Sequence, residues 1–146
     1  MEWDLIHSYT TKEAVADGVL IRVPEAIAKE AGIKYPVYMT SAAWAKYVEV
    51  PDGLDEHGQS IDGRLWDILL MFVMKIRVSK SEGDTLMFNL FVLMPSSEVF
   101  ESNEKVFEEN KSDKVQLREV TLKSVIAPQD IDDPSPAIFI MKPNQD

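Results

Sequence analysis

The sequence predicts an α+β domain in which N-terminal short helices pack on an antiparallel sheet of about four strands. Two observations lead to this class. Helix start and stop signals fill roughly the first 50 residues, and runs rich in β-branched and aromatic residues fill the part after residue 70. A third observation sets the domain count: there is no internal repeat and no long linker, so residues 1–146 form a single domain with an acidic insertion at 96–113.

Three short helices are expected, at residues 10–18, 24–32 and 42–50. Thr10 and Glu13 have capping-box spacing, so each side chain can accept a hydrogen bond from a free backbone N–H at the helix start. Gly32 suits the left-handed position that ends a helix. Residues 19–23, "VLIRV", have the length and composition of a short strand between the first two helices.

Four long strands are expected, at residues 71–79, 86–94, 114–126 and 137–143. In the first, alternate apolar residues from Phe72 to Val78 face one way, and Lys75 and Arg77 face the other. The strand at 86–94 is apolar on both faces, which predicts a central position covered on both sides, or a cover supplied by a second subunit. A homodimer is therefore one alternative.

Two further segments carry expectations about the connections. The phase of alternation slips at Glu119, which predicts a β-bulge in the 114–126 strand. In the 96–113 insertion, apolar pairs recur seven residues apart, which is the spacing of a small amphipathic helix. Residues 51–63 contain three glycines and many acids, which is typical of a surface loop.

The charge balance limits the classes of partner. Twenty-five Asp and Glu residues against 15 Lys and Arg give a formal net charge of −10 and a pI near 4.6. A global charge of that sign repels phosphates, so general binding to nucleic acid or to an anionic membrane is disfavoured and a cationic partner is favoured. The chain has no cysteine, which excludes disulfides and thiolate chemistry.

The apolar run from Ile68 to Met74 is too short for a membrane span, which needs about 20 residues. Charged residues at 67, 75 and 77 interrupt it at both ends. The first ten residues, "MEWDLIHSYT", lack the basic and apolar pattern of a signal peptide, so a cytoplasmic location is expected.

A basic stripe runs against the acidic composition. If the strand phases hold, five cationic side chains lie on or beside one face of the sheet and could hold an anion or a nucleotide. These candidate ligand-binding residues are Arg64, Lys75, Arg77, Arg118 and Lys123. The structural alternative is that long basic side chains cover the outer face of the sheet and pair with acids such as Glu119.

Catalytic and metal motifs give weak signals. The two histidines, His7 and His57, lack the arrangement of nucleophile, base and orienting group that a serine or cysteine enzyme needs. The acids around His57 lack the register of a calcium loop, and neither glycine-rich phosphate motif is present. No catalytic residue, metal or cofactor is assigned, and an enzyme using either histidine remains an alternative.

Four blocks of the chain resemble a known family in their order and spacing. They are "IHSYTTKEAVADGVLI", "AKEAGIKYPVYMTSAAWA", "GRLWDILLM" and "VTLKSVIAP". The chain resembles a bacterial domain-of-unknown-function family of small proteins encoded on plasmids, integrative elements and phages. The resemblance implies a cytosolic accessory protein of a mobile genetic element and assigns no catalytic residue.

This context and the negative charge together suggest a non-enzymatic binding protein that inhibits a host DNA-binding or defence factor, its carboxylates occupying a groove meant for phosphates. A basic host protein is the expected partner. The alternative interpretation of the acids is that they serve solubility alone. The candidate partner-binding acids are Asp52, Asp55, Glu56, Asp62, Glu98, Glu101, Glu104, Glu108, Glu109, Asp130, Asp132 and Asp133.

Overall fold

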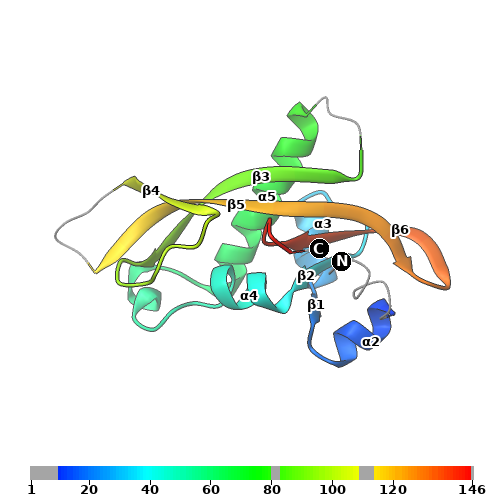
Figure 1. The fold of residues 1–146 in the computed structure, drawn as a ribbon, viewed down its shortest axis with the longest axis horizontal. Helices are drawn as coiled ribbons and strands as arrows, with labels where there is room; N and C mark the ends of the chain where they lie inside the picture. The colour runs from blue at the N-terminus through cyan, green and yellow to red at the C-terminus, as the bar shows by residue number, and fades with distance from the viewer. Residues whose placement is uncertain (1–9, 80–82, 109–113, 146) are drawn as a thin grey trace.

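The computed structural model describes residues 10–79, 83–108 and 114–145, which form an α+β fold (Figure 1). The strands are β1 (Leu20–Arg22), β2 (Val37–Thr40), β3 (Thr85–Pro95), β4 (Glu104–Glu108), β5 (Val115–Asp130) and β6 (Asp133–Met141). The helices are α2 (Thr11–Ala16), α3 (Glu25–Glu30), α4 (Ser41–Tyr47), the 3₁₀ turn η1 (Leu54–His57) and α5 (Ile61–Val78). The predicted α+β class is confirmed.

The strands form one six-stranded sheet in the order β1-β2-β6-β5-β3, and β4 also pairs with β5. Strand β2 runs parallel to β6, with Val37 opposite Ile138, whereas the other pairs are antiparallel. The sheet is therefore mixed and has six strands, rather than being antiparallel with about four. The difference arises because residues 37–40, for which no strand was predicted, pair as a strand with a segment about 100 residues later.

The expected N-terminal helices are present, and of the capping box only the Thr10 half is formed, since the Glu13 carboxylate accepts from the Thr10 hydroxyl instead of the Thr10 backbone N–H. The Thr10 hydroxyl accepts a hydrogen bond from the backbone N–H of Glu13 at 2.9 Å, and the Thr40 hydroxyl accepts one from Ala43 at 3.3 Å. After α3, Gly32 has φ +92°, a left-handed conformation that a residue with a Cβ rarely adopts. The short β1 strand lies where residues 19–23 predicted it.

The prediction of a strand at residues 71–79 is wrong, because these residues form the second half of α5. The helix begins at Ser60, whose hydroxyl accepts a hydrogen bond from Gly63 N–H at 3.0 Å. Its buried side chains, which include Leu65, Ile68, Leu69, Phe72 and Val73, follow the spacing of one helical face. Consequently the surface loop predicted at 51–63 ends three residues earlier, at Ser60, and contains η1.

Three expectations about the later strands are corrected. Strand β3 confirms the strand at 86–94, but it lies at the edge of the sheet rather than at its centre. The helix expected between 96 and 113 is replaced, over the described residues, by β4 and turns. The β3–β5 register is continuous past Glu119, so the bulge expected there is absent, and the irregularity lies instead in β4 between Val106 and Glu108.

The helices cover the two faces of the sheet unequally. Helices α3, α4 and α5 pack on one face, the inner face, where Met39, Phe88, Leu122 and Ile140 are buried. Helix α2 packs on the opposite, outer face, against a smaller cluster that contains Phe139 of β6. Figure 1 shows α5 crossing the sheet behind β5 and β3. In the described ranges, no helix is long and apolar enough to cross a membrane.

Candidate functional site

Arg118, one of the five candidate ligand-binding cations, lies fully buried on the inner face of the sheet. Its side chain has 0% exposure, and its Nη1 atom lies 2.9 Å from a carboxylate oxygen of Glu104, which is also fully buried. The guanidinium donates further hydrogen bonds to the Gln116 side chain at 2.9 Å and to the Glu98 carbonyl at 2.6 Å. Its Cζ atom lies 3.7 Å from the ring centroid of Phe100, in cation–π geometry.

Glu104 joins this pair to helix α4. The Tyr47 hydroxyl donates a hydrogen bond of 2.5 Å to the second carboxylate oxygen of Glu104, and it accepts one of 3.0 Å from the Asn103 amide. Burial and the bond to the Glu104 carboxylate together raise the pKa of Tyr47 far above its ordinary value of 10.0. Tyr47 therefore stays protonated, and a hydrogen-bond donor to Glu104, at neutral pH.

A half-buried cluster continues the network toward solvent. The Lys46 ammonium lies 3.2 Å from a Glu101 carboxylate oxygen and 3.4 Å from one of Glu98. Lys142 of the segment after β6 pairs with Glu101 at 2.8 Å. The hydrogen bond from Lys142, with that from Lys46, holds the pKa of Glu101 below its ordinary value of 4.5 despite partial burial. Each charge in this cluster has an opposite charge beside it, so the cluster offers no open site for an anion.

Arg64 and Lys123 are also buried, and both donate hydrogen bonds to backbone carbonyls of the protein itself. The Arg64 side chain donates hydrogen bonds to the Tyr47 carbonyl at 3.0 Å and to the Leu93 carbonyl at 2.9 Å. Its Nη2 atom is buried without a hydrogen-bond partner, and burial lowers the pKa of this guanidinium. Lys123 lies on the outer face, is 8% exposed and donates to the Gln145 carbonyl.

Lys75 and Arg77 lie on the exposed side of the C-terminal half of α5. A helix turns successive side chains by about 100°, so the two do not share the sheet face predicted for them. The five candidate ligand-binding residues are therefore not brought together: Arg118 and Lys123 occupy opposite faces of β5, and the other three lie on α5. The prediction that they form one stripe is wrong because it depended on a strand at 71–79.

Arg77 instead borders a hollow between α5 and the loop that joins α3 to β2. The hollow has a volume of about 240 Å³. Its lining residues are Gly32, Ile33, Lys34, Tyr35, Phe72, Val73, Ile76, Arg77 and Ile138. Apart from two cationic side chains and the Tyr35 hydroxyl, the lining side chains are apolar. We call this hollow the α5 pocket.

Lys34 and Arg77 carry the only charges of the α5 pocket, and both side chains are exposed. Among the residues that the structure describes, neither has a carboxylate within ion-pair distance. Arg77 reaches toward Gly32, since a Cβ added at that glycine would lie 3.8 Å from its Nη2 atom. The pocket therefore combines an apolar floor with two uncompensated positive charges.

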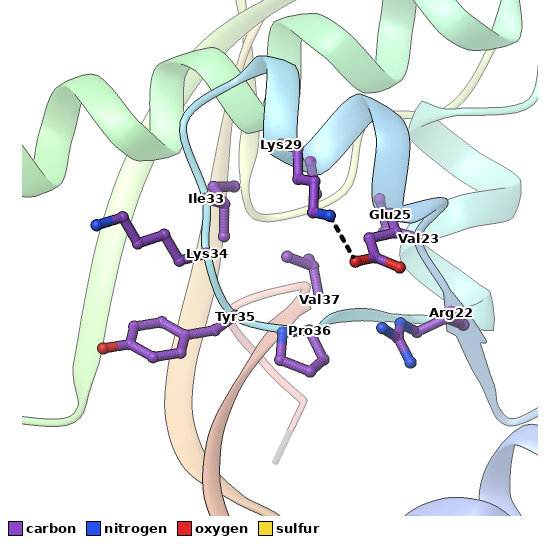
Figure 2. A pocket seen from close by; sticks show the side chains of 10 residues that line it. Arg22, Val23, Glu25, Lys29, Ile33, Lys34, Tyr35, Pro36 and Val37 are labelled. Atoms are coloured by element: carbon purple, nitrogen blue, oxygen red, sulfur yellow. Dashed lines mark ion pairs between the residues drawn. The ribbon is translucent and has the colours of Figure 1, made fainter.

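A second hollow of about 80 Å³ adjoins the α5 pocket under α3 and shares Ile33, Lys34 and Tyr35 with it. Figure 2 shows Ile33 and Val37 directed into this hollow, with Lys34 and Tyr35 directed outward from the same loop. Of its charged residues, Lys29 lies 3.0 Å from Glu25 and lowers the pKa of that carboxyl, whereas Arg22 and Lys34 have no carboxylate within ion-pair distance among the described residues. The smaller hollow thus adds one more cation, Arg22, and no free carboxylate.

The candidate partner-binding acids fall into two groups. Asp52, Asp55, Glu56 and Asp62 are exposed in one stretch around η1 and the first turn of α5, with no ion pair to the described residues. We call these four side chains the acidic loop. Asp132 is likewise exposed in the turn before β6.

The second group of acids makes internal contacts. Glu98, Glu101 and Glu104 belong to the buried network, as described above. Asp130 accepts hydrogen bonds from Thr11 N–H at 3.1 Å and Lys12 N–H at 3.0 Å, which caps the first turn of α2. Asp133 accepts hydrogen bonds from Ser135 and Gln129 in its own turn. Glu108 takes part in β4 through its backbone, and Glu109 lies outside the described residues.

The alternative of an enzyme depends on the two histidines. His57 is exposed and lines neither hollow, and His7 lies outside the described residues. Within the described ranges, no group of three or more His, Asp and Glu side chains is placed to hold a metal ion.

Sequence reasoning missed Lys34 and Tyr35, because their segment, "GIKYPV", was interpreted only as a connection. One local signal was available in the sequence: a cation and an aromatic residue, Lys34 and Tyr35, stand between the apolar Ile33 and Val37 in a short connection. In the structure Ile33 and Val37 are buried, and Lys34 and Tyr35 are exposed. The opposite wall of the α5 pocket, which α5 supplies, had no such signal, because it meets the 32–35 loop only through contacts between residues distant in sequence.

Comparisons of this chain with protein-family models, with curated proteins and with solved structures find no match.

Proposed function

We propose that this protein binds a small amphipathic anion in the α5 pocket, with an apolar body against Phe72 and Ile76 and the negative group between Lys34 and Arg77. The observation that carries the proposal is the pair of cations without carboxylate partners at the mouth of an apolar hollow. Two cations without ion pairs at the mouth of one apolar hollow favour a ligand with a negative group and an apolar body.

The size of the pocket restricts the class of ligand. Its volume of about 240 Å³ lies below the roughly 300–1,000 Å³ of sites for drug-sized molecules. A carboxylate on a short aliphatic or aromatic body fits that volume better than a dinucleotide does. A guanidinium donates two parallel hydrogen bonds to a carboxylate or phosphate, whereas an ammonium acts as a point charge, so Arg77 would orient the anion.

A thermal-shift titration with benzoate, octanoate and adenosine monophosphate tests the proposal. A ligand that binds only the folded protein raises its melting temperature as its concentration passes Kd. We expect benzoate or octanoate to raise the melting temperature of the wild type, and Lys34→Gln with Arg77→Gln to abolish that rise. Lys12→Gln with Lys114→Gln is the control, because it removes two positive charges at exposed sites that line neither hollow, and it should leave the rise intact. A flat response to all three compounds, or equal loss in the control, would contradict the proposal.

The four exposed acids of the acidic loop support a second candidate function. We propose that these side chains bind a cationic surface of a host protein, in the setting of a mobile genetic element that the sequence resemblance suggests. The eight other candidate acids do not all support this role, since six of them are held in β4, the buried network or the turns around β5 and β6.

The acidic loop can be tested without knowledge of the partner. The amide variant Asp52→Asn, Asp55→Asn, Glu56→Gln and Asp62→Asn removes four charges while keeping side-chain size. If this function holds, a plasmid that carries the wild-type gene should gain transformation efficiency in a host with a DNA-targeting defence system, and the amide variant should lose that gain. Equal efficiency for the wild type, the variant and an empty plasmid across several defence systems would rule it out.

A further inference from the structure

Strand β3 ends the sheet and has one free edge. It pairs with β5 along its whole length, and among the described residues no strand pairs with its other side. The Asp84 carbonyl, just before β3, accepts a hydrogen bond from Ile126 N–H at 2.8 Å. Because backbone groups alternate along an antiparallel pair, even-numbered residues of β3 face β5 and odd-numbered residues direct N–H and C=O to the free edge.

One contact confirms this alternation and limits the free edge. The carbonyl of Leu93, an odd-numbered residue, accepts a hydrogen bond from Arg64 at 2.9 Å instead of from a strand. Before that contact, from Thr85 to Phe91, the odd-numbered residues direct a row of backbone donors and acceptors away from the sheet.

The sequence of β3 lacks the features that normally protect an edge strand. Exposed edges are usually interrupted by lysines, inward charges, bulges or prolines, because they otherwise pair with other chains. "TLMFNLFVLMP" has no charged residue, its pairing with β5 has no bulge, and its one proline is the last residue. An edge of this composition in a chain with 27% charged residues indicates that something covers it.

Exposed apolar side chains flank the edge on the outer face of the sheet. Met87 is 45% exposed and Phe91 46%, and the Phe91 ring lies 4.3 Å from that of Phe107 between centroids. On the inner face, Figure 1 shows the C-terminal turns of α5 reaching past β3. Met74 and Val78 of these turns are exposed, but they lie on the side of the helix opposite the buried Leu69 and Phe72. An added strand at this edge would therefore meet apolar side chains on the outer face.

We infer that β3 pairs with β3 of a second copy of this chain, antiparallel across a two-fold axis, so that two sheets become one. An isologous contact needs a surface that is complementary to itself, and an uncharged strand edge meets that condition because two copies present no like charges to each other there. A cationic partner would gain no charge contact from this edge and would be attracted to the acidic loop instead. The inference is independent of the proposed ligand.

The size of the contact predicts a modest affinity. The free stretch of seven residues is about 24 Å long at about 3.4 Å per residue. With the side chains on the outer face and the protruding turns of α5, we expect a total buried area of roughly 1,000 Å² at most, near the lower limit for a specific interface. The dimer should therefore dissociate at low micromolar concentration rather than be permanent.

Sedimentation velocity of the full chain over 1–500 µM, matched with two variants of Asn89, tests the inference. Asn89 directs its N–H to the free edge, so Asn89→Pro removes a donor that only a partner strand would use. Asn89→Ala is the control, because it loses the same side-chain contact to Thr121 and keeps the N–H. The wild type and Asn89→Ala should reach twice 16.5 kDa with rising concentration, and Asn89→Pro should stay at 16.5 kDa. A wild type that is monomeric at 500 µM overturns the inference, as does dimeric Asn89→Pro.

A second pair of variants keeps the test decisive if the proline variant does not fold. Met87→Lys places a charge beside the proposed two-fold axis, whereas Ile131→Lys makes the same change at an 84% exposed site in the turn before β6. The first should weaken dimerisation at least tenfold and the second should not change it. Equal dimerisation in both variants counts against the β3 edge, and loss in the first alone supports it.

Discussion

The Arg118–Glu104 pair is the most buried ion pair among the described residues. It is stable there because the other hydrogen-bonding groups of both side chains also have partners. Removing two charges from water is costly, and the cost is offset only when every donor and acceptor finds a partner. Here Gln116, Tyr47 and two backbone carbonyls take the remaining hydrogen-bond positions. The network thereby fixes β4 and the turn before it against α4, although neither segment has a large apolar core of its own.

Arg118→Met should destabilise the protein by about 3–5 kcal/mol, because it leaves the Glu104 carboxylate buried without its main counter-charge. Urea unfolding followed by tryptophan fluorescence measures the change. Lys105→Met is the matched control, since its ion pair with Glu119 at 2.9 Å is exposed and such pairs contribute about 0–1 kcal/mol.

The double variant Arg118→Met with Glu104→Leu separates charge burial from lost packing. Replacing both partners by apolar residues removes the uncompensated charge, so part of the lost stability should return. If the double variant is as unstable as the sum of the two single variants, the buried charge is not the cause.

Short elements in this protein are stable through contacts from distant segments. Helix α2 has six residues, which is too short to be stable alone in water. Two side chains accept hydrogen bonds from its first-turn N–H groups. The Thr10 hydroxyl accepts from Glu13, and the carboxylate of Asp130, at the end of β5, accepts from Thr11 and Lys12. Asp130 was predicted from sequence as a partner-binding acid, and its contacts in the structure cap α2.

Asp130→Ala should free the first turn of α2 and cost about 1 kcal/mol locally, which increases amide exchange there about fivefold. Hydrogen exchange at Thr11 and Lys12 measures the effect. Asp132→Ala, which removes an exposed acid two residues away, should leave both amides unchanged. Equal exchange in the two variants would show that Asp130 does not stabilise the helix.

Helix α5 shows why an element can be assigned wrongly from a local pattern. Phe72, Met74, Ile76 and Val78 alternate like a strand, yet Phe72 and Ile76 also lie on one helical face with Leu65 and Leu69. A run that is apolar throughout fits both periods, so periodicity alone does not decide. The capped start at Ser60 and the length of 18 residues decide for a helix.

Across the molecule, local signals predicted the capped helices, β3, β5, β6 and the α+β class. They did not predict the parallel pairing of β2 with β6, because no residue near position 37 carries information about position 138. The α5 pocket has the same origin, since its walls come from the 32–35 loop, α5 and β6. The single-domain assignment, the cytoplasmic location and the mobile-element context remain predictions.

The ionic network also gives the whole protein an expected pH dependence. The folded-state pKa of Glu101 is depressed below 4.5, so its contribution is present above that value and is lost as pH falls through the folded-state pKa. For Lys46, burial opposes the charge, but Glu101 and its neighbouring carboxylates raise the pKa above 10.5, so its contribution is lost only at higher pH. Both contributions are therefore present between roughly pH 5 and pH 10.

Glu101→Gln should lower the melting temperature at pH 7 and have less effect at pH 3, because the contribution of the wild-type carboxylate declines as the pH falls toward and through its lowered pKa. Differential scanning calorimetry at the two pH values measures the difference. Glu119→Gln serves as the reference, because its ion pair reaches only the exposed Lys105. A destabilisation by Glu101→Gln that is equal at both pH values would assign the effect to packing instead of charge.

The parallel pairing of β2 with β6 has a consequence during synthesis. Strand β2 leaves the ribosome about 100 residues before the strand that lies beside it, so it waits while the rest of the sheet is translated. During that interval Tyr38 and Met39, buried in the finished fold, have no neighbour on one side and are open to chaperones and proteases. Completion of β6 is therefore the event that ends the exposure of the nascent chain.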